Sequence, residues 1–247
     1  MTLILGHRGA SGYAPENTMS SFKLAILQNA DGLEFDVHLS KDNIPVVIHD
    51  RTINRTTNGS GLVAEYTASE LQQFDAGSWY GKKFRGFKIP LLAEVLQLCK
   101  VVDKQLLLNI ELKAGSKMYK NIERIVIDMV SEYRLEKQVI ISSFDHFALQ
   151  RVKEINPNIK TGVLYAASWI KPWRYREVLN FNALHPAWHT LTPELLKHCH
   201  EAGLAVNTYT VNDTKYVDQM IALGVDGIIT NYPNKLIACR DEIKYKE

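Results

Sequence analysis

Hydrophobic and polar positions along the chain form a repeating unit in which a short apolar stretch precedes a longer stretch with helical spacing. Alternating or continuous apolar runs are typical of strands, whereas apolar residues three and four apart indicate an amphipathic helix. The strands expected from this pattern span residues 3–6, 30–39, 105–112, 139–142, 161–165, 181–185, 204–210 and 227–230. The helices expected between them begin at residue 19, span residues 91–102, 118–133 and 144–155, begin after residue 172, span residues 193–202 and 213–223, and begin at residue 236.

Strict alternation of strands and helices predicts an α/β fold with a parallel sheet covered by helices. Eight such units close a sheet into a (β/α)8 TIM barrel, and the 247 residues match the ~250 residues typical of that fold. We therefore expect one TIM-barrel domain over residues 1–247. A doubly wound open sheet is the alternative, but the Gly-rich dinucleotide-binding loop that usually accompanies it is absent from the sequence.

Residues 51–89 interrupt the repeat after the second strand. A further extended run at residues 44–48 precedes them, residues 54–61 are rich in Thr, Asn, Ser and Gly, and a short helix is expected at residues 69–74. Residues 77–86 are aromatic, basic and broken by glycine. Because a loop of this length inside a compact domain is more often functional than filler, we predict a small functional insertion here.

The first strand leads directly into two polar side chains, His7 and Arg8. Four residues, Leu-Ile-Leu-Gly, form a short buried strand, and two glycines soon after the polar pair break the pattern. Asn17 or Thr18 can cap the helix that follows. Active sites of TIM barrels lie at the carboxyl ends of the strands, so we expect His7 and Arg8 at a functional site. A surface turn is the alternative for such a pair on its own.

Three acidic residues share the inner side of the predicted barrel. Glu34 and Asp36 lie two residues apart on the second strand, so both carboxylates point into the lumen. Like charges this close resist ionisation unless a positive group lies between them. Glu111, from the neighbouring strand, adds a third hard oxygen ligand, and the set suits one divalent cation, Mg2+ or Ca2+, better than zinc. An ion-pair network with Arg8 and Lys113 is the alternative to a metal site.

Two histidines lie beside these carboxylates in the predicted barrel. His7 follows the first strand, and His49 ends the extended run after the second. Because imidazole titrates near neutral pH, such a pair beside a metal can divide the work of general acid and general base, and the sequence does not assign the two roles. His38 is expected at the rim, and His185, at the end of the sixth strand, is a further candidate to line the pocket.

Charge and composition narrow the class of partner. The net charge is +2, from 29 basic and 27 acidic residues without a long run of one sign. This balance argues against a nucleic-acid or polybasic membrane surface and favours a small-molecule partner. Three scattered cysteines fit a reducing compartment. The sequence contains neither a signal-peptide pattern nor an apolar run of ~18 residues, so we expect a soluble cytoplasmic protein. Whether a signal peptide was removed and whether the protein forms a homo-oligomer stay open.

Six ordered segments resemble the motifs of the glycerophosphodiester phosphodiesterase family. They are residues 7–18, 34–37, 49–61, 110–113, 206–212 and 224–233. The similarity thus spans nearly the whole chain. The sequence departs from the family at Tyr209, where the family usually has Trp, and at Asn231, where it often has Asp. Leu91 and Ala93 replace the common Thr and Glu. These departures concern pocket lining and support, and they leave the preferred alcohol open.

The resemblance implies a TIM barrel with an insertion after the second strand, and metal-dependent hydrolysis of glycerophosphodiesters to sn-glycerol 3-phosphate and an alcohol. In this hypothesis the acidic set holds one divalent cation on a phosphate oxygen, while Arg8 and Lys113 stabilise charge at phosphorus. Tyr209 is expected to contact the substrate. One of His7 and His49 activates the attacking oxygen, and the other protonates the leaving alkoxide. Family analogy makes the glycerol 2-hydroxyl the attacker, giving a cyclic phosphate that water then opens.

Three other functions remain open from the sequence. They are a lysophospholipase D activity, which needs an apolar trough beside the site, a phospholipase C-like barrel, and a non-catalytic barrel that binds a metabolite. Trp169 and Trp173, after the fifth strand, are candidates for a lid or a lipid-facing lip. Further aromatic candidates for the pocket mouth are Tyr13, Trp79, Tyr80 and Phe84.

Overall fold

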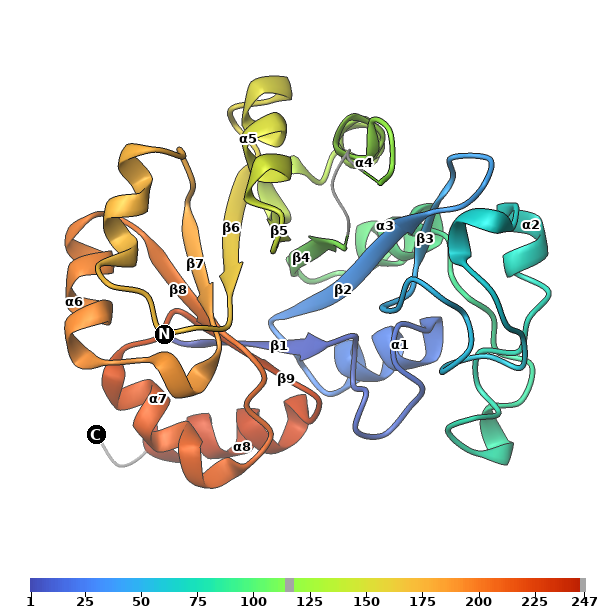
Figure 1. The fold of residues 1–247 in the computed structure, drawn as a ribbon. Coiled ribbons are helices and arrows are strands. Elements are labelled where there is room, and N and C mark those ends of the chain that lie inside the picture. Colours follow the sequence, from blue (N-terminus) through green and yellow to red (C-terminus); the bar gives the residue numbers. More distant parts are fainter. Residues whose placement is uncertain (114–117, 245–247) are drawn as a thin grey trace.

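The computed structural model describes residues 1–113 and 118–244, and its strands form a closed barrel (Figure 1). The barrel strands are β1 (Leu3–His7), β2 (Gly32–Leu39), β4 (Leu107–Leu112), β5 (Val139–Ser143), β6 (Lys160–Tyr165), β7 (Ala183–Pro186), β8 (Ala205–Thr208) and β9 (Gly227–Thr230). Each runs parallel to its neighbours, and the sheet closes because β1 pairs with both β2 and β9. The predicted TIM barrel is thereby confirmed.

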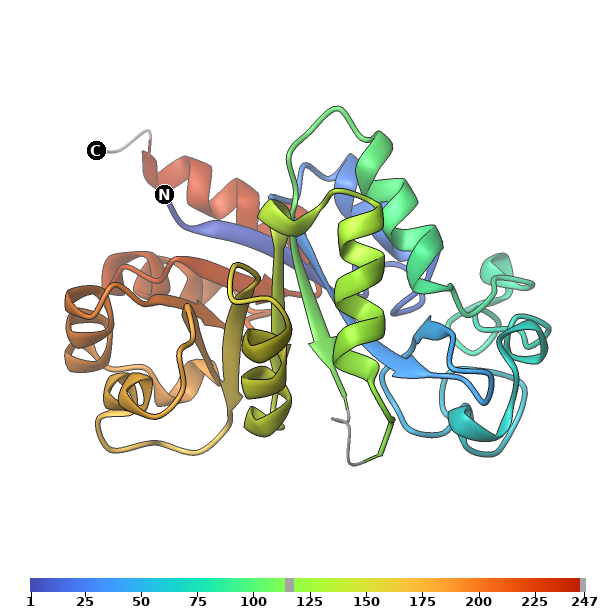
Figure 2. The ribbon, with the colours of Figure 1, turned by 90° about the horizontal axis from the view of Figure 1, so that it is seen from above.

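Helices lie on the outer side of the barrel. They are α1 (Met19–Leu27), α3 (Leu92–Val101), α4 (Ile122–Glu132), α5 (His146–Ile155), α6 (Pro193–Glu201), α7 (Val217–Leu223) and α8 (Pro233–Lys244). Seen from above, α4 and α5 stand side by side, and α5 covers β5 and β6 (Figure 2). Among the helices that the structure describes, none is both long and apolar enough to span a membrane.

Strand β2 shows how the sequence pattern sets the two faces of the barrel. Phe35 and Val37 are fully buried in the main core, which lies between the strands and the outer helices. Phe35 packs edge-on against Phe22 of α1, with ring centroids 5.6 Å apart, and burying each such ring contributes about 1.5–3 kcal/mol. Because side chains alternate along a strand, Glu34 and Asp36 point to the other side, into the lumen.

Several elements differ from the sequence prediction, and α8 begins at Pro233 rather than at residue 236. The segment after β6 forms a 3-10 helix, η4 (Pro172–Glu177), in which only Pro172 is buried, so it lacks the apolar face that stabilises a longer helix. Helix α4 begins four residues later than expected. Helix α7 follows a separate 3-10 turn, η6 (Thr214–Tyr216). The extended run before the insertion forms β3 (Pro45–Val47), which pairs antiparallel with the end of β2.

The insertion after β3 has a small core of its own. It contains η1 (Val63–Glu65), α2 (Ala68–Leu71) and η2 (Lys82–Phe84), so the helix expected at residues 69–74 is shorter and begins earlier. The buried side chains of the insertion pack with those of β3 and its flanks. This second core comprises Val46, Ile48, Ile53, Val63, Ala68, Leu71, Ala76 and Ile89. Both views place the insertion beside the barrel, next to the end of β2 (Figures 1 and 2).

Candidate active site

A cavity of about 260 Å³ opens at the carboxyl ends of the barrel strands. Its charged and titratable lining comprises His7, Arg8, Glu34, His49, Glu111 and Lys113. Its remaining lining is mostly apolar and comprises Phe144, Leu164, Tyr209 and Ile229, with Asn109 and Thr210. The structure therefore brings all the site residues predicted from the sequence to one cavity, except that Asp36 lies just behind the lining.

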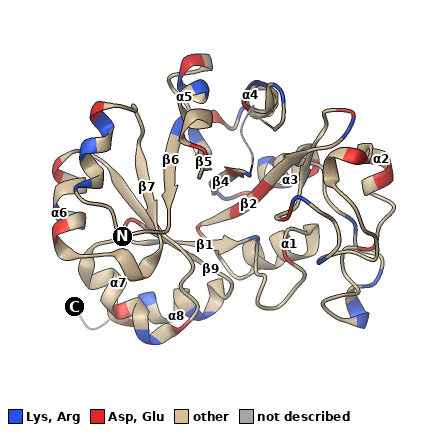
Figure 3. Cartoon of the chain, in the orientation of Figure 1, with Lys and Arg blue, Asp and Glu red and all other residues tan. Residues whose placement is uncertain are grey.

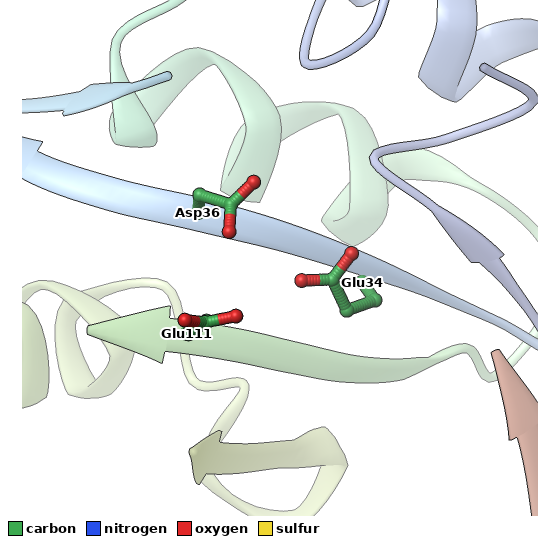
Figure 4. Close-up of side chains that lie close together, drawn as sticks. All are labelled: Glu34, Asp36 and Glu111. Atoms are coloured by element: carbon green, nitrogen blue, oxygen red, sulfur yellow. The ribbon is translucent and has the colours of Figure 1, made fainter. Parts of the chain in front are cut away.

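Strand register brings the acidic residues together. Strands β1 and β2 pair so that His7 lies opposite Glu34, and β2 and β4 pair so that Asp36 lies opposite Glu111. The three carboxylates point towards one another (Figure 4), and one ligand oxygen from each lies within 4.8 Å of the others. In Figure 3, acidic positions colour parts of β2 and β4, whereas most other charged positions lie on outer helices and loops.

Two cationic side chains form ion pairs with Asp36 and Glu111. Arg8 Nε lies 3.3 Å from Asp36 Oδ2, and Arg8 Nη1 donates to Glu16 Oε1 at 2.7 Å. Lys113 Nζ donates to Glu111 Oε1 at 2.7 Å and lies 3.4 Å from Asp36 Oδ1. The ion-pair network considered from the sequence is thus present. It does not neutralise the cluster, because one of its two cations is also engaged by Glu16.

The pKa values of the cluster reflect the same excess of negative charge. Burial, and then repulsion by Asp36, raises the pKa of Glu111 to about 7. Burial and the same neighbour raise the pKa of Glu34 well above its ordinary value. Burial acts in this direction on Asp36 too, but the positive charges of Lys113 and Arg8 outweigh it and lower the pKa of Asp36 to about 2. Carboxylates that resist ionisation in this way gain from further positive charge nearby.

The donor set fits a hard divalent cation. Glu34, Asp36 and Glu111 can each offer a carboxylate oxygen to one position, and sets made only of oxygen suit Mg2+ and Ca2+. Asp36 Oδ1 is buried and accepts no hydrogen bond from the described residues. Buried polar atoms are normally hydrogen-bonded, so a carboxylate oxygen that has the 3.4 Å ion pair with Lys113 but no hydrogen bond from the described residues is consistent with a ligand atom. These residues could therefore hold one cation between β2 and β4.

A turn with left-handed backbone follows β1 and directs Arg8 at the cluster. Arg8 has a φ of 52° and Gly9 a φ of 82°, in a region that few non-glycine residues adopt. The Arg8 amide donates to Glu34 Oε2 at 3.0 Å, and Ser21 Oγ donates to the Arg8 carbonyl at 2.8 Å. A Cβ at Gly9 would lie 2.3 Å from Ser21 Oγ, so the turn requires glycine there. Strained backbone held by its surroundings is typical of functional sites.

Thr18 caps α1, whereas Asn17 contacts the acidic cluster. The Thr18 side chain accepts a hydrogen bond from the Ser21 amide and so caps α1. Asn17 instead donates from Nδ2 to Asp36 Oδ2 at 2.7 Å. This contact fixes the orientation of the most deeply buried carboxylate in the cluster. Sequence reasoning missed it, because the chain gives no sign of which strand a loop asparagine will reach.

His7 is oriented by a side chain that follows β9. Its Nδ1 lies 2.6 Å from Asn231 Oδ1, so Nδ1 carries the proton and Nε2 faces the cluster, 3.9 Å from Glu34 Oε2. Burial, and then the charge of Arg8, lowers the pKa of His7 to about 4. His7 is therefore neutral near neutral pH and presents an unprotonated nitrogen to the cavity. The sequence marked Asn231 only as a departure from the family pattern.

His49 is oriented by a carboxylate. Its Nδ1 lies 2.6 Å from Asp50 Oδ1. Arg55 donates to both oxygens of Asp50, at 2.7 and 3.0 Å, and to both oxygens of Glu16, at 2.8 Å each. Burial lowers the pKa of His49, although the charge of Asp36 opposes this shift. Asp50, Arg55 and Glu16 all lie within the recognised motifs, but the motifs alone did not reveal that they contact one another.

Two histidines differ from their predicted positions. His38, expected at the rim, is fully buried, with Nδ1 2.9 Å from the Tyr119 hydroxyl and Nε2 3.0 Å from the His49 carbonyl. His185, a candidate for the pocket lining, is fully buried outside that lining, with Nε2 3.1 Å from Asn207 Nδ2. Burial lowers the pKa of His38 to about 4 and that of His185 to about 3, so both support the fold as neutral groups.

Aromatic residues follow β5 and β6, and one of them, Phe144, lines the cavity. Phe144 is half exposed, lines the cavity and packs edge-on against Tyr209. The Tyr209 hydroxyl donates to the Tyr165 carbonyl at 3.0 Å, so a substrate contact by Tyr209 would come from its ring. Trp169 stacks on Tyr165 with centroids 4.8 Å apart. Trp173 instead stacks on a histidine of α6 and is only partly buried against the core.

The other aromatic candidates for the mouth pack away from the cavity lining. Tyr13 lies edge-on to Tyr232, with centroids 5.4 Å apart. Within the insertion, Tyr80 packs against both Trp79 and Phe84, at 5.5 and 5.4 Å. Tyr13 therefore packs the first loop against the segment after β9, and the other three rings pack within the insertion.

Comparison with known proteins covers almost the full chain. Residues 7–235 match the model of the Glycerophosphoryl diester phosphodiesterase family. A glycerophosphodiester phosphodiesterase of Caldanaerobacter subterraneus subsp. tengcongensis is 44% identical over 236 residues, which cover 96% of each chain. One from Bacillus altitudinis is 37% identical over 246 residues, which cover 99% of this chain and 100% of the relative.

The fold is shared with solved structures of the same family. A structure of an Oleispira antarctica phosphodiesterase in complex with the product sn-glycerol-3-phosphate matches with a TM-score of 0.91 and 31% identity, covering 98% of this chain and 97% of the other. Together with the family match, this likeness confirms the resemblance found in the motifs. The chain therefore belongs to the glycerophosphoryl diester phosphodiesterase family and is a phosphoric diester hydrolase built on a TIM barrel.

Proposed function

We propose that the protein hydrolyses glycerophosphodiesters to sn-glycerol 3-phosphate and an alcohol in a reaction that depends on one divalent cation, Mg2+ or Ca2+. The observation that carries this proposal is the convergence of three clustered carboxylates, two cationic side chains and two histidines on one cavity. The related enzyme of O. antarctica binds sn-glycerol-3-phosphate as its product. An anionic phosphodiester is the substrate that this combination of charges suits best.

Charge stabilisation on the phosphate is assigned to the acidic cluster and the two cationic side chains. A cation held by Glu34, Asp36 and Glu111 supplies a Lewis acid for a phosphate oxygen. Arg8 is suited to phosphate because its planar guanidinium can donate two parallel hydrogen bonds, whereas Lys113 acts as a point charge. Both side chains are already held in place by carboxylates, so they stabilise charge developing at phosphorus without reorganising.

Proton transfer is assigned to the two histidines. His7 is neutral, with Nε2 directed at the cluster, and accepts the proton of the attacking hydroxyl, which family analogy identifies as the glycerol 2-hydroxyl. His49 in its protonated form donates a proton to the leaving alkoxide, and Asp50 behind it favours that imidazolium form against the lowering of the His49 pKa by burial. Water then opens the cyclic phosphate with the two roles exchanged.

A lysophospholipase D activity is the second candidate, because the half-exposed Phe144 lines the cavity and further exposed apolar side chains follow the same strand and the next one. They come from the loops and helix start after β5 and β6, and they are Phe144, Phe147, Trp169 and Ile170. Contact between the rings of His146 and Trp169, with centroids 5.5 Å apart, joins the two loops. An acyl chain attached to the substrate could lie on this surface.

The test is release of sn-glycerol 3-phosphate from glycerophosphocholine and glycerophosphoethanolamine after EDTA treatment, with and without added Mg2+ or Ca2+. We expect metal-dependent release by the wild type and none by Glu34→Gln, while Glu132→Gln, at an exposed position on α4, behaves as the wild type. Release that survives EDTA, or equals wild type in Glu34→Gln, would contradict the metal role. Exclusive turnover of lysophosphatidylcholine would favour the second candidate.

A further inference from the structure

We propose that Arg55, a residue of the insertion, is a positioning residue that holds both His49 and Arg8 in their working orientations through Asp50 and Glu16. The inference rests on the proposed function and adds to it a reason for the insertion. Arg55 itself does not line the cavity, and 43% of its side chain is exposed. It can therefore influence the reaction only through the side chains that it contacts.

The contacts of Arg55 form two branches that end in the cavity. In one branch, Arg55 Nε and Nη2 donate to Asp50 at 2.7 and 3.0 Å, and Asp50 Oδ1 lies 2.6 Å from His49 Nδ1. In the other branch, Arg55 Nη1 and Nη2 donate to Glu16 at 2.8 Å each, and Glu16 Oε1 accepts from Arg8 Nη1 at 2.7 Å. Each carboxylate is thus shared between Arg55 and a residue that lines the cavity.

The guanidinium keeps two carboxylates facing each other. Without the positive charge of Arg55, Glu16 and Asp50 would repel and turn towards solvent, and His49 and Arg8 would each lose the oxygen that orients them. Only arginine offers enough donors in one plane to bind both carboxylates at two oxygens each; the lysine ammonium has three donors and no fixed plane. The geometry therefore requires arginine rather than positive charge alone.

The backbone around Arg55 is held independently of its side chain. The Ile53 amide donates to the Gly61 carbonyl at 3.0 Å, and the Gly61 amide donates to Asn54 Oδ1 at 3.0 Å. Thr57 Oγ1 donates to the Ile53 carbonyl at 2.7 Å, and Ile53 is fully buried in the second core. Replacing Arg55 should therefore leave the loop folded, which makes its positioning role separable from a structural one.

The branches predict different kinetic effects. Asp50→Asn should lower kcat, because it disturbs His49, and Glu16→Gln should raise KM, because it disturbs Arg8. Arg55→Ala and Arg55→Lys should show both changes, with kcat/KM lower by about 100-fold. Arg55→Lys should lower kcat less in the Asp50→Asn variant than it does in the wild-type protein, because both changes act through His49. The matched control is Arg85→Ala, at an exposed arginine of the insertion outside this network.

A second readout is independent of turnover. The Nδ1 proton of His49 should give a hydrogen-bonded proton NMR signal in the wild type and in Arg85→Ala, and its absence from His49→Gln assigns it. In Arg55→Ala and Arg55→Lys this signal should be lost while the melting temperature stays unchanged. If the wild type hydrolyses no glycerophosphodiester but this pattern holds, the proposed function fails and the positioning role stands. A retained signal in both Arg55 variants, or full kinetic rescue by Arg55→Lys, would overturn the positioning role.

Discussion

The two histidines of the site differ in the charge of the side chain behind them. His7 contacts the neutral carboxamide of Asn231, whereas His49 contacts the carboxylate of Asp50. A carboxylate stabilises imidazolium relative to imidazole, and a neutral amide does so much less. This difference between partners supports the assignment of base to His7 and acid to His49 in the proposed reaction.

A substrate with a good leaving group separates these roles. For glycerophosphocholine, His7→Ala and His49→Ala should each lower kcat by about 100-fold or more. With p-nitrophenol in place of choline, the leaving group needs little protonation. His49→Ala should then recover most of the wild-type rate of nitrophenolate release, while His7→Ala should not. Equal recovery in both variants, or recovery in His7→Ala alone, would show that the assignment is wrong.

The sequence predicts which side chains face the site better than it predicts the residues that they contact. The spacing of Glu34 and Asp36 was sufficient to place both carboxylates in the lumen, because the period of a strand is two. The same reasoning placed His38 on that face. It did not predict how deeply His38 is buried, because this depends on Tyr119 in a loop 81 positions away. The link between Arg55 and Glu16 spans 39 positions and leaves no periodic trace in the sequence.

At the scale of elements, the site depends on register between β1, β2 and β4. The α/β repeat predicted these strands, and with them which side chains face inward. Register itself follows from barrel closure, which the local sequence does not encode. The helix expected after residue 172 is a short 3-10 helix, whose proline start is visible in the sequence but whose lack of a buried face is not.

The insertion should behave as a local folding unit that supports the site. Leu71 of α2 is fully buried in the second core, so Leu71→Ala should cost about 2–5 kcal/mol of local stability. Amide hydrogen exchange should quicken in the insertion while the barrel strands stay protected, and kcat/KM should fall because Arg55 loses its support. Leu62→Ala, at a position with 39% exposure, is the control. Faster exchange across the barrel strands would contradict this independence.

At the scale of the whole molecule, the acidic cluster is a local cost to stability in a chain with a net charge of only +2. Burial and mutual repulsion raise the pKa of Glu34 and Glu111, so ionising these two carboxylates opposes folding when no cation is bound, whereas the lowered pKa of Asp36 acts in the opposite direction. Functional sites often lower the stability of the folded protein in this way. A cation bound only by the folded state would reverse it.

Thermal melting with and without a divalent cation tests whether Glu34, Asp36 and Glu111 hold it. At pH 8, above the pKa of about 7 of Glu111, Mg2+ or Ca2+ at about 100 times its Kd should raise the wild-type melting temperature by roughly 5–10 °C. The metal-free Glu111→Gln variant should melt above the metal-free wild type and gain little from either ion. An equal gain in wild type and variant, or none in the wild type, would contradict this role of the three carboxylates.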